Sequence, residues 1–408
     1  MNQNELKDLD VLRGLAETVA SAAQERNQQE KIRLWVKAAN LSPERPMVLA
    51  NPQNGWAELV PDISLICQDS FYRNLEYRLR QLIFRIHHIP DDYPILNIFE
   101  IGLSINYGNF GFEEKRSESG VKGGAYHIEP VIKNRDDAAK LSPPVCSIDW
   151  NTSKEAYEKA KHAIGGIMEV RQQGCSYVRC GLTRKLIHLR GLEQMLYDLY
   201  DDPDMMHFLM QFLMEQQLRE LDFLEKNNAL FTNTGPNVFC GSGGLAVISE
   251  NFIDRPAVTA EMFAWGESQE FSSISCQMYE EFVLRYQLPI LSKFGLVDYG
   301  CCEALDNKYD VLMKKIKNLR WIAVSPWAER AIAAEKIQNN YVYVYKPNPS
   351  IICRPIPDYT GAEEEIRQTM EIAKGCTMYF VMKDTSTFFN DPYVIGKWAE
   401  NAKKVVCS

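Results

Sequence analysis

The sequence predicts an α/β protein, a (β/α)8 TIM barrel that is preceded by a helical extension over residues 1–40. Two observations favour this fold. Short apolar runs alternate with longer stretches of helical spacing, and one run with its stretch takes about 20–40 residues, the scale of a βα unit. Eight such runs occur within residues 41–408, so a single barrel domain accounts for them.

Each expected strand is a short run with strand-forming bulk, such as Val324, Val342 and Phe380. The eight strand candidates are 46–50, 94–102, 176–182, 261–267, 295–300, 319–325, 341–346 and 377–383. A ninth run at 229–234 is assigned to an insertion at 226–258 and not to the barrel.

The helices between the strands are expected from their spacing and their start signals. Helical spacing predicts helices at 192–224, 308–317, 327–339 and 363–373. The pattern Thr-x-x-Glu at 152–155 and 360–363 fits a capping box, and Ser325 fits an N-cap. In Asp202-Pro203 and Asp391-Pro392, a capping acid precedes a proline suited to the first helical turn.

Composition excludes several classes of partner. The 408 residues include 45 basic and 54 acidic side chains, a formal charge of -9, which argues against binding of nucleic acid or of a membrane surface. No run of about 18 apolar residues predicts a transmembrane helix, and residues 1–15 lack a secretory pattern. We therefore expect a cytoplasmic protein whose 11 cysteines are reduced thiols.

The active site of such a barrel is expected where the carboxyl ends of the strands converge. The residues that end the runs are Asn51, Glu100, Leu182, Glu267, Cys301, Cys302, Glu303, Ser325, Lys346 and Asp384. Several of them are charged, and charges in such a place are costly unless they are paired or functional.

The segment 299–303 reads Tyr-Gly-Cys-Cys-Glu and is the first candidate. Thiolates and carboxylates are zinc ligands, so Cys301, Cys302 and Glu303 are candidate metal ligands. Both cysteines can face the site only if the chain turns there, which Gly300 permits. The alternative is one core cysteine and one partly exposed cysteine without a metal.

The segment 265–270 is the second candidate. Glu267 is a candidate general acid or base, or a metal ligand. Trp265 would form a flat apolar wall for a planar substrate, and Gln269 would contact the same substrate. The alternative is a loop whose carboxylates face water.

Two later strand ends complete the candidate site. Lys346 would pair with Glu267 or Glu303, or would hold a substrate carboxylate; the alternative is a structural ion pair. Asn348, in a loop made rigid by two prolines, would contact the substrate. Asp384 is either catalytic or the cap of the following turn.

Several of these segments resemble the uroporphyrinogen decarboxylase superfamily. They are the residues 200–204 (Tyr-Asp-Asp-Pro-Asp), the stretch 261–302, and Ser325, Lys346 and Asp384 to the end of the chain. The resemblance covers residues 150–408 well and 40–150 poorly, and it implies the barrel fold. The decarboxylases of the superfamily carry an Arg-Gln-Ala-Gly-Arg segment that residues 45–51 lack, so the resemblance argues against porphyrinogen decarboxylation.

The other branch of the superfamily comprises methyltransferases that serve corrinoid proteins and bind zinc through His-x-Cys and a later cysteine. Here Tyr299 replaces the histidine, so the resemblance implies a changed ligand set of Cys301, Cys302 and one of Glu303, Glu267 or Asp384. It implies zinc-dependent transfer of a methyl group from a small methylated or methoxylated compound to a corrinoid on a separate protein. This activity belongs to anaerobic one-carbon metabolism, and members of the superfamily often form homodimers.

Two other functions remain open from the sequence. The first is a metal-free decarboxylase or lyase acting on a small carboxylated compound, with Lys346 holding the carboxylate and Glu267 or Tyr299 moving the proton. The second is a non-catalytic barrel that serves as a binding subunit. The concentration of ionisable residues at the strand ends argues against the second.

Overall fold

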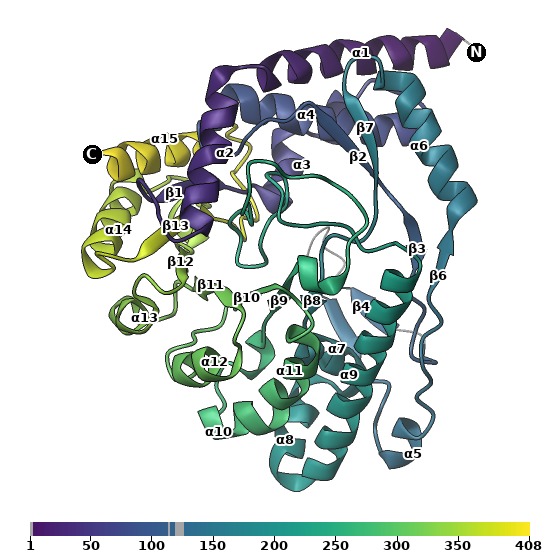
Figure 1. Ribbon diagram of the computed structural model, residues 1–408, viewed down its shortest axis with the longest axis vertical. Coiled ribbons are helices and arrows are strands. Elements are labelled where there is room, and N and C mark those ends of the chain that lie inside the picture. Colours follow the sequence, from purple (N-terminus) through teal and green to yellow (C-terminus); the bar gives the residue numbers. More distant parts are fainter. Residues whose placement is uncertain (1–2, 113–114, 119–125) are drawn as a thin grey trace.

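The computed structural model describes residues 3–112, 115–118 and 126–408 and shows an α/β protein built around a parallel seven-stranded sheet (Figure 1). Its strands, in spatial order, are β1 (Met47–Ala50), β13 (Thr377–Met382), β12 (Val342–Tyr345), β11 (Leu319–Val324), β10 (Leu296–Tyr299), β9 (Phe263–Gly266) and β8 (Arg179–Cys180). The α/β class expected from the sequence is confirmed.

Helices connect the strands. They are α1 (Gln3–Ala23), α2 (Arg26–Ala39), α3 (Trp56–Leu59), α4 (Ser70–His88), α5 (Arg135–Ala138), α6 (Trp150–Ile164), α7 (Leu182–Arg190), α8 (Leu192–Asp201), α9 (Pro203–Lys226), α10 (Cys276–Tyr279), α11 (Arg285–Leu291), α12 (Tyr309–Lys315), α13 (Arg330–Ile337), α14 (Tyr359–Ile372) and α15 (Val394–Cys407). In the described part of the chain, no helix combines the length and the apolar character needed to cross a bilayer.

Three strand pairs stand apart from the main sheet. The pair β2 (Ile98–Gly102) with β7 (Glu169–Gln173) is parallel, while β3 (Ser104–Asn106) with β6 (Ser147–Asp149) and β4 (Lys115–Glu118) with β5 (Tyr126–Glu129) are antiparallel. Among the described residues, no ladder joins the β2–β7 pair to β1 or β8. Closure of the barrel therefore stays a prediction.

The strand expected at 176–182 is wrong in its bounds. The chain pairs with β2 earlier, through β7, and returns to the main sheet only for the two residues of β8. Leu182 does not end a strand but begins α7. Val178, Cys180, Leu182 and Leu186 all pack into the same core, so an apolar run shared by a strand and a helix was read as one strand.

Alternate residues of the main sheet face two different layers. Val48 and Phe380 pack among the outer helices, whereas Leu49 and Tyr379 face a core that also contains Trp35 of α2. The same inner core includes apolar residues of the segment 238–247, which crosses the middle of the molecule between α9 and β9 (Figure 1). The segment 238–247 therefore packs against the inner face of the sheet.

The helices expected at residues 1–40 are α1 and α2. Helix α1 packs along α4 and α6 over the β2–β7 pair, where Leu12, Leu75, Phe99 and Ala163 form a second apolar core. Helix α2 anchors in the main core through Trp35, whose indole N–H donates to a backbone oxygen at 2.8 Å. Both helices are thus packed into the protein.

Several expected helix starts are wrong by a few residues. Asp149 caps α6 and Asp358 caps α14, each accepting a backbone N–H, so Thr152 and Thr360 lie inside their helices. An aspartate one turn earlier competes for the same backbone donors, and the capping-box pattern does not distinguish the two. The expected cap of α9 by Asp202 is confirmed.

Two further boundaries differ from the sequence expectations. Helix α13 begins at Arg330 and α15 at Val394, because Ser325 and Asp391 accept from the backbone two residues on and form turns instead of helix caps. The single helix expected at 192–224 is two helices, α8 and α9, which are separated at Asp202.

Candidate active site

A cavity of about 570 Å³, called here the mouth cavity, lies at the carboxyl ends of the parallel strands. It is lined by five residues expected from the sequence to belong to the site: Trp265, Gln269, Cys301, Cys302 and Asp384. Asn51 and Glu100, which end other expected strands, line it as well. Strand ends that are far apart in the sequence therefore meet in one place.

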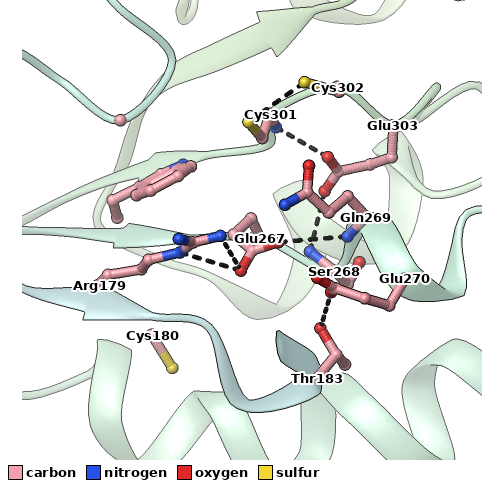
Figure 2. A network of polar contacts seen from close by, with 12 residues as sticks. Arg179, Cys180, Thr183, Glu267, Ser268, Gln269, Glu270, Cys301, Cys302 and Glu303 are labelled. Atoms are coloured by element: carbon pink, nitrogen blue, oxygen red, sulfur yellow. Dashed lines mark hydrogen bonds and ion pairs between the residues drawn. The ribbon is translucent and has the colours of Figure 1, made fainter. Parts of the chain in front are cut away.

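Glu267 lies directly behind the wall of the mouth cavity, where Arg179 covers it. Both the Nε and the Nη2 atoms of Arg179 donate to Oε1 of Glu267, at 3.1 and 2.9 Å (Figure 2). The glutamate is fully buried, and this burial, with Glu270 nearby, raises its pKa to about 7 against the opposing effect of Arg179. Glu267 thus holds Arg179 in place, and it is Arg179 that faces the cavity.

Trp265 forms the flat wall that the sequence suggests. The guanidinium of Arg179 lies 4.4 Å from the centre of a Trp265 ring, and the indole N–H donates to the backbone oxygen of Gly300 at 2.9 Å. A side chain at Gly241 would collide with this ring, so the glycine allows the segment 238–247 to approach it closely. The wall is therefore fixed from three sides.

Glu303 clamps the turn that follows β10. Its two carboxylate oxygens accept from the backbone N–H of Ser268 at 2.9 Å and of Cys301 at 2.8 Å (Figure 2). Gly300 makes the turn with φ +100°, a conformation that side chains disfavour. The glutamate therefore positions the two cysteines and ties β9 to β10.

The two cysteines lie side by side above a buried lysine. Their sulfur atoms are 3.6 Å apart, and the Nζ atom of Lys346 is 3.9 Å from each. Asp384 Oδ2 lies 3.6 Å from the sulfur of Cys302 and 3.9 Å from Nζ of Lys346. These contacts are long, so the group is held by charge and packing more than by short hydrogen bonds.

The surroundings separate the acidities of the two thiols. The hydrogen bond from Cys301, together with the ammonium of Lys346, lowers the pKa of Cys302 to about 7 in spite of burial. The same hydrogen bond and burial raise the pKa of Cys301. Burial alone would lower the pKa of Lys346, but the sulfurs and Asp384 raise it. Cys302 is thus the more acidic thiol of the pair.

Three features of this arrangement bear on the expected zinc ligand set. Both oxygens of Glu303 accept backbone N–H groups, and the ammonium of Lys346 lies beside the two sulfurs. Across the described residues, no three His, Cys, Asp or Glu side chains converge as a metal site would require. Of the expected third ligands, Asp384 lies nearest the pair, 3.6 Å from the sulfur of Cys302, but it also lies 3.9 Å from the ammonium of Lys346.

Two expected site residues lie elsewhere. The hydroxyl of Tyr299 donates to Gln287 at 2.7 Å and accepts from Tyr279 at 2.6 Å, in the core under the outer helices. Asn348 caps a one-turn helix through Ser350 and does not line the mouth cavity. Tyr299 points away because successive strand residues face opposite sides of the sheet: Asp298 faces the inner side, and Tyr299 faces the outer core with Val297.

Sequence reasoning missed Arg179, Asp298 and Lys383. The carboxylate of Asp298 accepts from the backbone N–H of Ser242, and burial raises its pKa to about 7. Lys383 donates to the backbone oxygen of Gly241 at 3.0 Å. A charged residue within an apolar run, as in Leu-Val-Asp-Tyr at 296–299, is the signal that could have identified Asp298.

Comparison with known proteins does not assign the chain to a family. No family model matches it, and no curated protein matches it. A solved structure of a methyltransferase from Methanosarcina mazei superposes with a TM-score of 0.46 at 9% identity, over 90% of this chain and 97% of that chain. A likeness of this extent carries no information on the activity of this protein.

Proposed function

We propose that the protein is an enzyme that transfers a methyl group from a small methylated or methoxylated compound to a corrinoid carried by a separate protein. The observation that carries the proposal is the pairing, in one cavity at the strand ends, of a cation, Arg179, with a thiol of low pKa, Cys302. We infer that the strands form the (β/α)8 barrel of the superfamily that the sequence resembles.

Three cavity residues, Trp265, Arg179 and Gln269, bind the donor in this reaction. The donor lies against Trp265, and its methyl-bearing heteroatom lies near the guanidinium of Arg179. The bond from carbon to the heteroatom breaks as the acceptor nucleophile forms its bond to the methyl group, and the electron pair stays on the heteroatom. Arg179 stabilises this developing negative charge, while Glu267 fixes the position of Arg179. Gln269 supplies a polar contact to the donor.

The two cysteines and their neighbours would supply the proton that the leaving group takes up. A leaving alkoxide or thiolate takes up one proton after the transfer, whereas a protonated methylamine leaves as the neutral amine. The Cys301–Cys302 pair with Lys346 and Asp384 holds exchangeable protons at the cavity wall. No step uses a metal. Whether zinc binds stays a prediction, tested by metal analysis of the anoxically purified protein and of its C301S/C302S variant.

The experiment is a methyl-transfer assay under anoxic conditions with reduced cobalamin as acceptor. The donors are methoxybenzenes, methylamines and methyl sulfides, and the product is methylcobalamin, followed by its absorbance. We expect R179Q to lower kcat by about 100-fold or more, the cost of removing one preorganised charge. The matched control is R219Q, on an arginine of α9 that does not line the mouth cavity.

A metal-free lyase is the alternative function that would replace this proposal. It would release CO2 from a carboxylated compound, whereas none of the methyl donors would react. In that case R179Q would raise KM for the carboxylated compound, because Arg179 would then bind the carboxylate.

A further inference from the structure

A second cavity, called here the side cavity, has a volume of about 610 Å³ and lies between α7, α9 and the loop at 107–112. Its apolar walls come from elements that are far apart in the sequence: Tyr107, Phe110, Val131, Leu189, Leu221 and Leu224. This volume is within the range of pockets for small organic molecules. No pattern in the sequence predicts this cavity.

The walls of the side cavity suit a flat apolar ligand. Phe110 is fixed by an edge contact with Phe212, with ring centres 5.7 Å apart. Leu221 and Leu224 are fully buried on the facing side of α9. Rings and branched side chains around a preformed space bind planar carbon skeletons well, because the walls need little rearrangement.

The charges in the side cavity leave one cation without a partner. Lys185 lies 3.9 Å from the carboxylate of Glu220, and Arg179 is bound to Glu267. Arg184 lines the cavity and is exposed, and no hydrogen bond or ion pair engages it within the described part of the chain. Because Arg179 is paired with Glu267 and Lys185 lies near Glu220, the charge of Arg184 is left to favour an anionic ligand.

We propose that the side cavity is a second ligand site, which binds an aromatic carboxylate, with the carboxylate at Arg184 and the rings between Phe110 and Leu221. This site goes beyond the proposed methyl transfer. Tyr177, Arg179 and Arg184 line both cavities, so the bound ligand lies next to the reacting groups. A ligand there would contact the Arg179 that Glu267 holds.

The first test measures binding to the full chain by calorimetry. The probes are 2-naphthoate and its neutral analogue 2-naphthylmethanol. We expect naphthoate to bind at least about tenfold more tightly, since a charge-assisted contact to an unpaired arginine is stronger than a neutral one. R184Q should remove this preference, while the control R219Q, an exposed arginine of α9 outside both cavities, should keep it.

Three results of the first test would overturn the proposal: no binding of naphthoate, equal binding of the two probes, or unchanged naphthoate binding in R184Q.

The second test locates the ligand. L221W would fill the side cavity and weaken both probes at least about tenfold. A crystal structure of the wild-type protein with 6-bromo-2-naphthoate does not depend on that variant folding. Bromine beside Phe110 and Leu221 supports the proposal, and bromine in the mouth cavity contradicts it.

Discussion

The mouth cavity and the side cavity share Arg179 and Arg184, but these two arginines differ in their partners. Around the mouth cavity, Arg179, Glu267 and Glu303 are bound to partners within the protein at 2.8–3.1 Å. Arg184, by contrast, is exposed and engages no partner among the described residues. Charges that are held by internal partners are positioned and have altered acidity, as reaction chemistry requires, whereas a spare charge is available to recognise a ligand.

The largest expected effect comes from breaking the turn of the mouth cavity. E303A removes the acceptor of two buried backbone N–H groups, so the free energy of unfolding should fall by about 3–5 kcal/mol. Urea denaturation measures it. E303Q, which keeps one acceptor oxygen, should lose less than E303A. Equal stability of E303A and wild type would mean that the clamp is not structural.

The second effect is a pH dependence that comes from Glu267, behind the wall of the mouth cavity. The pKa of Glu267 is raised from 4.5 to about 7, so the folded protein keeps a proton that the unfolded chain releases. The free energy of unfolding should therefore fall as pH rises from about 4.5 to 7. Glu267 should account for roughly 3 kcal/mol of this fall. E267Q should lack this part of the slope. Parallel pH profiles of the two proteins would contradict it.

The third effect concerns the loosely held thiols. C301A removes the hydrogen bond that contributes most to lowering the pKa of Cys302. At pH 7 its alkylation by iodoacetamide should be roughly tenfold slower, because the thiolate is the reactive form. Peptide mass spectrometry separates Cys302 from the exposed Cys407, whose rate serves as the internal control. An unchanged rate at Cys302 would show that Cys301 does not tune it.

The smallest effect is expected at Asn348, which lies outside the mouth cavity. N348A removes one capping hydrogen bond to Ser350 and should cost about 1 kcal/mol or less, measured by thermal unfolding. Methyl transfer and naphthoate binding should both be unchanged. A large rise in KM for the methyl donor would show that Asn348 contacts the substrate after all. It would also weaken the distinction between cavity residues and loop residues.

The sequence by itself predicted the α/β class and much of the mouth cavity. Strands β9 to β13 were expected within a few residues, because each is a short buried run bounded by turns. Since parallel strands end on the same edge, the residues that follow them had to approach one another, and Trp265, Cys301, Cys302 and Asp384 do so. The unusual turn at Gly300 could also be predicted from the sequence, because glycine has no side chain and readily adopts a positive φ.

Only the tertiary structure decided the direction and the partners of each side chain. Glu303 and Tyr299 were expected at the site, yet one binds the backbone and the other lies in the outer core. Arg179 gained its role from Glu267, which is 88 residues away along the chain. The side cavity forms where the loop at 107–112 meets α9. Sequence periodicity reports which residues are buried, but contacts between distant segments arise only when the chain packs.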